Sequence, residues 1–346
     1  MNGISFSLED FQNAAAQFRD EILLLPVVGL DETLKEMTIR PGVHGIEYVG
    51  TISTDGELGN YNSSRVDTDD AKLEVRALQT YLGSVIKEFE PNKVANTVLG
   101  RQAALTGDAQ KDAISAKLVL ASLMKSTSRN LNDVIWSAAY SVSGTKSATL
   151  FNGFDTITAA EITAGNIATS KGNLYEFSEA LTVQNVIAKL KALYKAASPV
   201  LKATECNIYC DPDILALYND AYLASHNGTP YNQQFEQTVL EGTSGKWKFV
   251  ALSNKAGSGY ITVSPKENLL IGYDNEGGDT YLQVDRFKPF VLTFSAAMFF
   301  GVQFESIQKE RLLIGKLYVE EESSSSSQQA EESSSSSQQA EETSQQ

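Results

Sequence analysis

Cysteine and histidine are scarce in this chain of 346 residues, which contains two of each. Neither His44 nor His226 has a cysteine or aspartate at metal-ligand spacing, so we predict structural histidines and no zinc site. Cys206 and Cys210 fall in one expected strand, where positions four apart are about 13 Å from each other, too far for a disulfide. We expect both to be small buried residues, and without a disulfide framework we expect synthesis in a reducing cytoplasm.

Long apolar segments are also lacking. The longest uncharged run, 289–304, is too short to cross a bilayer and is rich in phenylalanine and β-branched residues. It is typical of one or two core strands. The start of the chain has no basic region of the kind that opens a signal peptide. We therefore expect no membrane partner.

Catalytic motifs are missing as well. The segment 242–245 has the wrong spacing for a nucleophile elbow, and no phosphate-binding loop occurs. Ser143-Gly-Thr-Lys146 matches the S-x-x-K pair of penicillin-interactive hydrolases, but no S-D-N or K-T-G follows. Two acidic clusters, at 67–70 and 274–279, do not fit a calcium-binding EF-hand loop and are expected to be solvated turns. We predict no enzyme activity, no metal and no cofactor, with a serine hydrolase using Ser143 and Lys146 as the alternative.

Negative charge, in contrast, is plentiful. The net charge is −15, and seven glutamates with no lysine or arginine lie in 320–346, which leaves −8 for the rest of the chain. An acidic body argues against a groove that grips the phosphate backbone of nucleic acid. The tail repeats 321–330 residue for residue as 331–340. It has almost nothing apolar to bury, so we predict disorder at 320–346. We expect the tail on the outside of any particle that holds DNA, because its carboxylates would repel phosphate; an inward tail is the alternative.

The segment 45–90 predicts a long two-stranded arm. Alternating β-branched residues at 46–52 and alternating charge and apolar residues at 72–77 indicate two strands, and the stretch 53–71 between them is rich in Gly, Asn, Ser and Asp. A loop this long inside a compact domain is functional or disordered. We predict that the arm contacts another copy of the protein, with a surface loop as the alternative. The residues expected at that contact are Gly56, Leu58, Tyr61 and Arg65.

An N-terminal helix is predicted next to the arm. Ser7-Leu-Glu-Asp10 has the form of a capping box, and Pro26 is expected to end the helix. The apolar stripe between them is made by Leu8, Phe11, Ala15, Phe18, Ile22 and Leu25. A coiled-coil dimer is an alternative, but the stripe has fewer than the roughly 3–4 heptads that are typical of one. We expect it to pack onto a neighbouring subunit or onto the chain's own body, and Phe11, Phe18 and Ile22 are the candidate contacts with a neighbour.

The remaining elements alternate between helices and strands and predict an α+β fold. The segment 108–142 predicts one long broken helix or two helices in line, and 155–178 predicts a loosely structured connection. Thr182 is expected to cap a helix that ends at Pro199, and Asp211-Pro212-Asp213 to start another. The strands are expected at 205–210, 246–252, 259–263, 268–273, 279–285 and 289–304.

This order of elements resembles that of the major capsid proteins of tailed bacteriophages, whose fold encapsulin shells share. The local matches are Glu88-Phe-Glu-Pro91, the spine helix at about 108–127, Trp136 to Phe154, Asn207 to Pro212, Lys246 to Leu252, and Phe290 to Phe304. The resemblance covers about 1–319. It implies an N-terminal arm at 1–45, an extended loop at 46–90, a peripheral domain made of 91–180 and 286–319, and an axial domain at 181–285.

The resemblance also implies a function. The chain would be a virion protein that self-assembles, as hexamers and pentamers, into the icosahedral head shell around a double-stranded DNA genome. It would enclose the DNA without sequence-specific binding and be assembled in the cytoplasm of the host bacterium. A separate scaffolding protein, or none, and a portal would be partners. The family has no catalytic residues to carry over. Some members crosslink through a lysine in the extended loop, and no lysine lies between Ser53 and Ala71 here. An encapsulin-like compartment is the alternative, and the long arm and the tail favour the phage.

Overall fold

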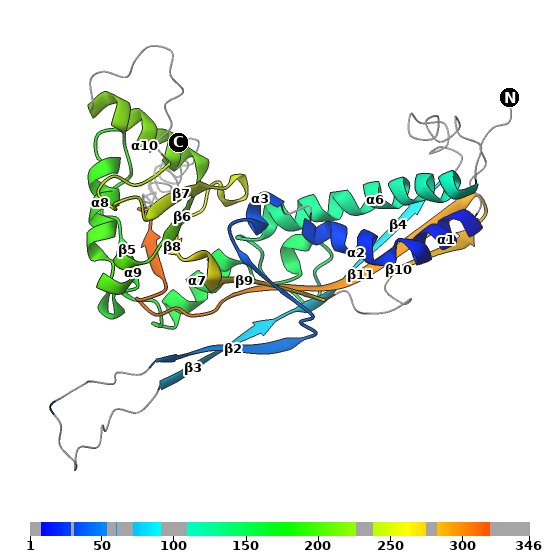
Figure 1. Ribbon diagram of the computed structural model, residues 1–346, viewed down its shortest axis with the longest axis horizontal. Helices are drawn as coiled ribbons and strands as arrows, with labels where there is room; N and C mark the ends of the chain where they lie inside the picture. The colour runs from blue at the N-terminus through cyan, green and yellow to red at the C-terminus, as the bar shows by residue number, and fades with distance from the viewer. Residues whose placement is uncertain are drawn as a thin grey trace, which may run out of the picture.

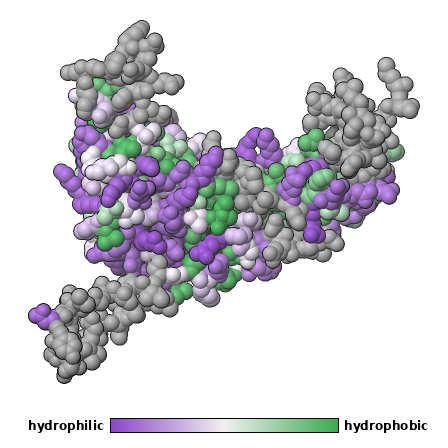
Figure 2. Space-filling model, viewed as in Figure 1, coloured by the Kyte–Doolittle hydropathy of each residue, from purple (hydrophilic) through white to green (hydrophobic). Residues whose placement is uncertain are grey.

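The computed structural model describes residues 8–28, 31–53, 60, 72–90, 109–225, 238–274 and 282–318. It shows an elongated body (Figure 2) from which a narrow two-stranded arm projects (Figure 1). The tip of the arm, the acidic cluster at 67–70, His226 and the tail at 320–346 lie outside the described residues.

A five-stranded sheet runs along the body, with the long strand β11 (Val291–Phe304) in its middle. Strand β4 (Tyr81–Phe89) pairs antiparallel with one edge of β11. Strands β10 (Leu282–Lys288) and β9 (Leu269–Asp274) pair antiparallel with β11 as well, and β1 (Thr38–Pro41) pairs parallel with β9. β11 therefore joins segments that are up to 220 residues apart in sequence.

Helices cover one face of this sheet. α1 (Leu8–Gln17), α2 (Arg19–Val28) and the 26-residue α6 (Ala109–Val134) pack together over β10 and β11 (Figure 1). A short α3 (Asp31–Leu34) follows α2. The side chain of Gln12 donates a hydrogen bond to the carbonyl of Val284. The buried side chains between the helices and the sheet include Phe11, Ile22, Leu120, Met124, Val284, Leu292 and Phe294.

A second five-stranded sheet forms the other end of the body. Its strands lie in the order β5 (Leu174–Glu176), β12 (Leu313–Lys316), β8 (Tyr260–Ser264), β6 (Cys206–Cys210) and β7 (Trp247–Ala251). Pairing is antiparallel between β12, β8 and β6 and parallel at both ends. The sheet thus mixes both kinds of pairing, as an α+β fold allows.

Three helices pack around the second sheet: α8 (Val186–Ala196), α9 (Pro199–Ala203) and α10 (Pro212–Ser225). The Asp211 carboxylate accepts the backbone N–H of Asp213 at 2.9 Å, so it satisfies a free donor at the start of α10. The core here includes Leu190, Leu193, Ile208, Tyr218, Trp247, Ile261 and Val263.

The two sheets are connected by α7 (Phe154–Thr163) and by single turns of 3-10 helix. These turns are η1 (Ser147–Thr149), η2 (Thr169–Lys171), η3 (Ser253–Lys255) and η4 (Lys266–Asn268). Trp136, Phe154 and Phe304 form part of a core between them.

The α+β class and the main strands agree with the sequence prediction, but four local predictions are wrong. Pro26 lies within α2 instead of ending it, and residues 109–134 form one unbroken helix, whereas Val142 lies in an exposed loop. The predicted loose connection at 155–178 contains the helix α7. β4 leaves the arm to join the large sheet, so within 46–90 the described arm strands are β2 (Ile46–Ser53) and β3 (Lys72–Gln79).

Candidate assembly surface

The arm has one face turned to the body and one face turned to solvent. β2 and β3 pair antiparallel, with Tyr48 opposite Ala77 and Gly50 opposite Val75. On the inner face Val49 and Leu78 are buried against Val43 and Leu270. On the outer face the large side chains are uncovered, with exposed fractions of 54% for Ile46, 73% for Tyr48 and 50% for Val75.

This exposure runs against the usual pattern of antiparallel strands, which put polar side chains on their solvated face. Ile46, Tyr48 and Val75, called the outer arm face below, lie on the same side of the ladder because opposite residues share a face. Exposed apolar side chains that gather on one surface are typical of a place where another protein binds. The outer arm face is therefore a candidate contact surface.

A polar network fixes the base of the arm. The Arg76 guanidinium in β3 donates to a Glu161 carboxylate oxygen of α7 at 2.7 Å and to the Gln303 side-chain oxygen at 3.1 Å. Gln303 in turn donates to the carbonyl of Ala77 at 3.1 Å. Both charged side chains are largely buried, with exposed fractions of 14% and 19%. Burial alone would raise the pKa of Glu161, but hydrogen bonds from Asn166 and Arg76 and the charge of Arg76 lower that pKa overall.

The sheet also makes room for the arm at Gly301. A Cβ atom at this position would lie 2.1 Å from the carbonyl oxygen of Gln79, at the end of β3. No side chain fits at this distance. The arm therefore leaves the body through a close backbone approach that needs glycine.

The N-terminal stripe packs onto the chain's own body, one of the two outcomes expected for it. Phe11 and Ile22 are fully buried, and Phe18 is half-buried. The Phe11 ring meets the Phe89 ring edge-on at 5.2 Å, and the Lys117 ammonium lies 4.3 Å from the centre of the Phe18 ring. A contact of these three residues with a neighbouring subunit stays a prediction. Gly56, Leu58, Tyr61 and Arg65 lie outside the described residues, so the contact predicted for them also stays untested.

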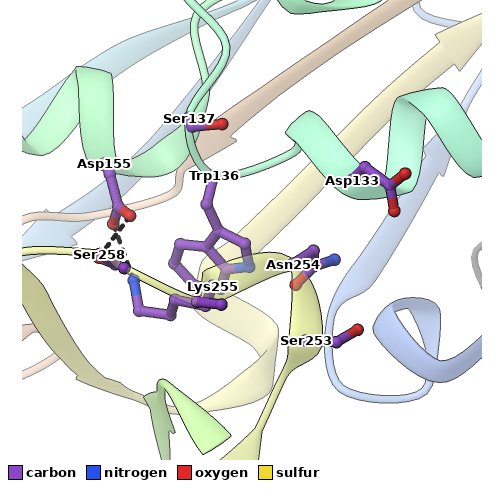
Figure 3. Close-up of a pocket in the computed structure, with 10 residues that line it drawn as sticks. Asp133, Trp136, Ser137, Asp155, Ser253, Asn254, Lys255 and Ser258 are labelled. Atoms are coloured by element: carbon purple, nitrogen blue, oxygen red, sulfur yellow. Dashed lines mark hydrogen bonds and ion pairs between the residues drawn. The ribbon is translucent and has the colours of Figure 1, made fainter. Parts of the chain in front are cut away.

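A buried lysine, Lys255, contacts residues from separate segments of the body. The Lys255 ammonium lies 2.8 Å from a carboxylate oxygen of Asp155 and 3.6 Å from the centre of the Trp136 ring. The other Asp155 oxygen accepts the Ser258 hydroxyl at 2.7 Å (Figure 3). Burial lowers the pKa of Lys255, while the charge and hydrogen bond of Asp155 act in the opposite direction. A cavity of about 320 Å³ lies beside the cluster, also bordered by Asp133.

This cluster is structural in its chemistry. The Lys255 side chain has no exposed surface, and its ammonium forms an internal ion pair with Asp155. Sequence reasoning missed it, because a lysine between an asparagine and a glycine-rich turn has the pattern of a solvated loop.

The two residues of the alternative catalytic pair make contacts with other residues of their loop. Ser143 and Lys146 lie in an exposed loop, and the Ser143 hydroxyl lies 3.5 Å from that of Ser141. The Lys146 backbone instead exchanges hydrogen bonds with the Thr149 hydroxyl. Neither residue borders the cavity beside Lys255.

The scarce residue types lie apart from one another. Cys206 and Cys210 are free and buried in β6. His44 lies 3.0 Å from a carboxylate oxygen of Asp274 and packs on the Phe299 ring at 4.1 Å. Over the described part of the chain, no group of three or more metal-ligating side chains is found. Within the same part, every helix falls short of the length and apolar character that crossing a membrane requires.

Solved structures with the same arrangement come from phage and related particles. A chain of the satellite phage P4 procapsid, in a structure that includes the size determination (Sid) protein, matches with a TM-score of 0.55 and 12% identity, over 85% of this chain and 89% of that one. The chain has the fold of a phage capsid protein.

Two further structures support the same fold. The capsid asymmetric unit of cyanophage A-1(L) matches with a TM-score of 0.53 and 13% identity, over 86% of this chain and 93% of that one. The capsid of the native GTA particle matches with a TM-score of 0.52 and 10% identity, over 92% and 93%. No protein-family model matches the sequence. No curated protein matches it either.

Proposed function

We propose that this chain is the major capsid protein of a tailed bacteriophage and that its copies assemble into the icosahedral head shell around a double-stranded DNA genome. The outer arm face carries the proposal. A two-stranded hairpin is marginal in water by itself, yet this one exposes Ile46, Tyr48 and Val75 to solvent. A second copy that covers this face would remove the exposed apolar area from water.

The geometry of the arm supports assembly into closed rings. The arm leaves the elongated body near its middle and runs away from the turn between β10 and β11 (Figure 1), and the Arg76–Glu161 pair fixes its base. A contact between the arm of one subunit and a different surface of the next is head-to-tail, and such contacts generate rings when the rotation closes. Hexamers and pentamers are rings of this kind. The fold shared with three capsid structures fits the same proposal.

The finer parts of the proposal follow from the resemblance. The peripheral domain would comprise 91–180 and 286–319, and the axial domain 181–285. Here β9 lies in the axial range but pairs with β11 of the peripheral range, so the two domains would share the large sheet. Assembly would take place in the host cytoplasm, with a portal and, where one is used, a separate scaffolding protein. The shell role needs no enzyme activity, and the open loop that holds Ser143 and Lys146 fits a protein without it.

A variant of the outer arm face tests the proposal. Replacing both Tyr48 and Val75 by serine should leave the subunit folded, since both side chains are at least half exposed, and should abolish particles seen by negative-stain microscopy. Deleting 56–65 should have the same effect. The matched control is Val200→Ser, which removes a side chain that is 55% exposed in α9. Wild-type protein that stays monomeric with and without a scaffold would contradict the proposal. Labelling of Ser143 by a fluorophosphonate would instead favour the hydrolase.

A further inference from the structure

Two aromatic side chains project from the turn between β10 and β11. Phe287 and Phe290 are both 76% exposed, and only Pro289 and Phe290 separate the paired residues Lys288 and Val291. Burial of a phenylalanine is one of the larger apolar contributions that a side chain can make to folding. Neither ring makes that contribution within the described chain. We call Phe287 and Phe290 the aromatic turn.

The backbone of this turn is strained in order to carry Phe290. Its φ is +63°, in the left-handed region that bulky side chains rarely adopt. Proline followed by a residue of positive φ is the pattern of a type II turn, whose second central position usually holds glycine or asparagine. A phenylalanine at this position costs stability that glycine or asparagine would not cost. Strain of this kind at an exposed side chain indicates a role for the side chain outside the fold of the subunit.

The support beneath the aromatic turn is rigid. The strands that lead to it bury Leu282, Val284, Leu292 and Phe294 against α1 and α6, and Lys288 forms an ion pair with Glu88 of β4, on the other side of β11, at 2.8 Å. The two rings are therefore presented in a fixed position, which lowers the entropy lost when a partner binds. Aromatic residues held in this way are typical of the centre of protein interfaces.

Position and charge indicate what binds there. The turn lies at the end of the body opposite the second sheet, at the right in Figure 1, where a neighbouring copy can reach it. The exposed Arg286 precedes Phe287 in a chain whose net charge is −15, while the charge of Lys288 is paired with Glu88. The Arg286 guanidinium can attract a carboxylate of another copy of the same acidic chain.

We propose that the aromatic turn binds a second copy of this chain, with Phe287 and Phe290 inserted into the contact. This inference rests on the proposed shell function and names a contact surface separate from the arm. On this proposal the backbone strain at Phe290 is offset in the assembled state, in which a second copy covers the ring.

The substitution Phe290→Asn distinguishes a role of the ring in assembly from a role in folding. Phe290→Asn should leave the melting temperature of the subunit unchanged or raise it by up to about 3 °C, since asparagine tolerates a positive φ. The same variant should lower the yield of particles, and the double variant Phe287→Ser, Phe290→Asn should lower it about tenfold or more. Val142→Ser is the matched control, because Val142 is 89% exposed in a different loop and its loss should leave the yield unchanged.

The outcomes distinguish this inference from the proposed function. Wild-type protein that forms no particles contradicts both. Wild-type particles together with an equal yield from the double variant overturn the aromatic contact alone. A fall of more than about 5 °C in the melting temperature of Phe290→Asn also overturns it, because the ring would then belong to the fold of the subunit.

Photo-crosslinking identifies the partner directly. Benzoylphenylalanine is placed at position 290, and assembly is carried out with an equal mixture of 14N- and 15N-labelled subunits. Crosslinked peptides that combine both labels support the proposal. Crosslinks confined to a single label overturn it, since a segment of the same chain would then cover the turn. Binding of the subunit to anionic lipid vesicles that is lost in the double variant, without mixed-label crosslinks, would assign the turn to a membrane surface instead.

Discussion

The Lys255 ammonium lies between the Asp155 carboxylate and the face of the Trp136 ring, at 2.8 and 3.6 Å. The three residues come from different parts of the chain: the turn η3, the start of α7 and the segment after α6. Lys255 ends η3, and four residues separate it from the strand β8 of the second sheet. Trp136 belongs to the core that also contains Phe300 and Phe304 of β11, and Asp155 lies in the first turn of α7. The ion pair thus adds a polar contact to the apolar core that joins the two sheets.

Removing this ion pair should destabilise the protein strongly. Lys255→Ala should lower the free energy of unfolding by about 3–5 kcal/mol, because it leaves the Asp155 carboxylate without its buried partner. The measurement is urea unfolding followed by tryptophan fluorescence, which Trp136 reports. The control is Lys316→Ala, whose side chain is 46% exposed beside Glu176 and should change stability by less than about 1 kcal/mol. Equal effects of the two substitutions would show that Lys255 is not a structural tie.

Acid should loosen the base of the arm. The pKa of Glu161 lies below its ordinary value of 4.5 in the folded protein, so its ion pair with Arg76 stabilises the fold above that value. This stabilisation is lost as the pH falls through the lower folded pKa. Wild-type protein should therefore exceed Glu161→Gln in stability by about 1–3 kcal/mol at neutral pH, and the difference should shrink below pH 4.5.

Chemical denaturation at a series of pH values measures this difference. A gap between wild type and Glu161→Gln that stays constant from neutral pH to about pH 3 would contradict the expectation, because only an ionised Glu161 makes the pair. Glu179→Gln is the control, since the Glu179 side chain is 61% exposed where it pairs with Lys189.

Both cysteines should resist modification in the native subunit. Burial raises the pKa of the Cys206 thiol and of the Cys210 thiol to about 12 each, and the thiolate is the species that reacts. A thiol reagent that releases a chromophore on reaction should release almost none with native protein at pH 8. With protein in urea it should detect two reactive thiols per chain. Rapid reaction of native protein would mean that β6 opens far more often than its buried position indicates.

Glycine should be required at position 301 but not at position 259. Gly301→Ala brings a Cβ atom to within 2.1 Å of the Gln79 carbonyl, so it should lower the melting temperature markedly or displace the arm from the sheet. Gly259→Ala is the control, because nothing lies within 4 Å of a Cβ atom there. A melting temperature for Gly301→Ala equal to that of the control would show that the arm can move away at no cost.

The α+β class and most strands could be predicted because the runs 206–210, 247–251 and 291–304 are short, mostly apolar and bounded by turn residues, which is typical of buried strands. Alternation does not identify the partner of a strand. From the sequence, the whole of 72–90 was predicted to belong to the arm. In the structure only β3 pairs with β2, whereas β4 pairs with β11 of the large sheet. The helix α7 was missed because its threonines and its two isoleucines favour strands.

The candidate surface was less accessible to prediction. The outer arm face follows from alternation in 46–52, but its anchor depends on Arg76 meeting Glu161 at a separation of 85 residues. Lys255 and Asp155 are 100 residues apart, and nothing local to either indicates the pair. Such pairs form only once the two sheets pack against each other, and that packing depends on the whole fold.

Strand β11 has a mechanical consequence. Its 14 residues are hydrogen-bonded to β4 along one edge and to β10 and β9 along the other. A force that pulls the two ends of the body apart runs parallel to these strands, so it loads many hydrogen bonds at the same time and cannot open them one after another. We therefore expect the subunit to resist stretching most strongly along its long axis.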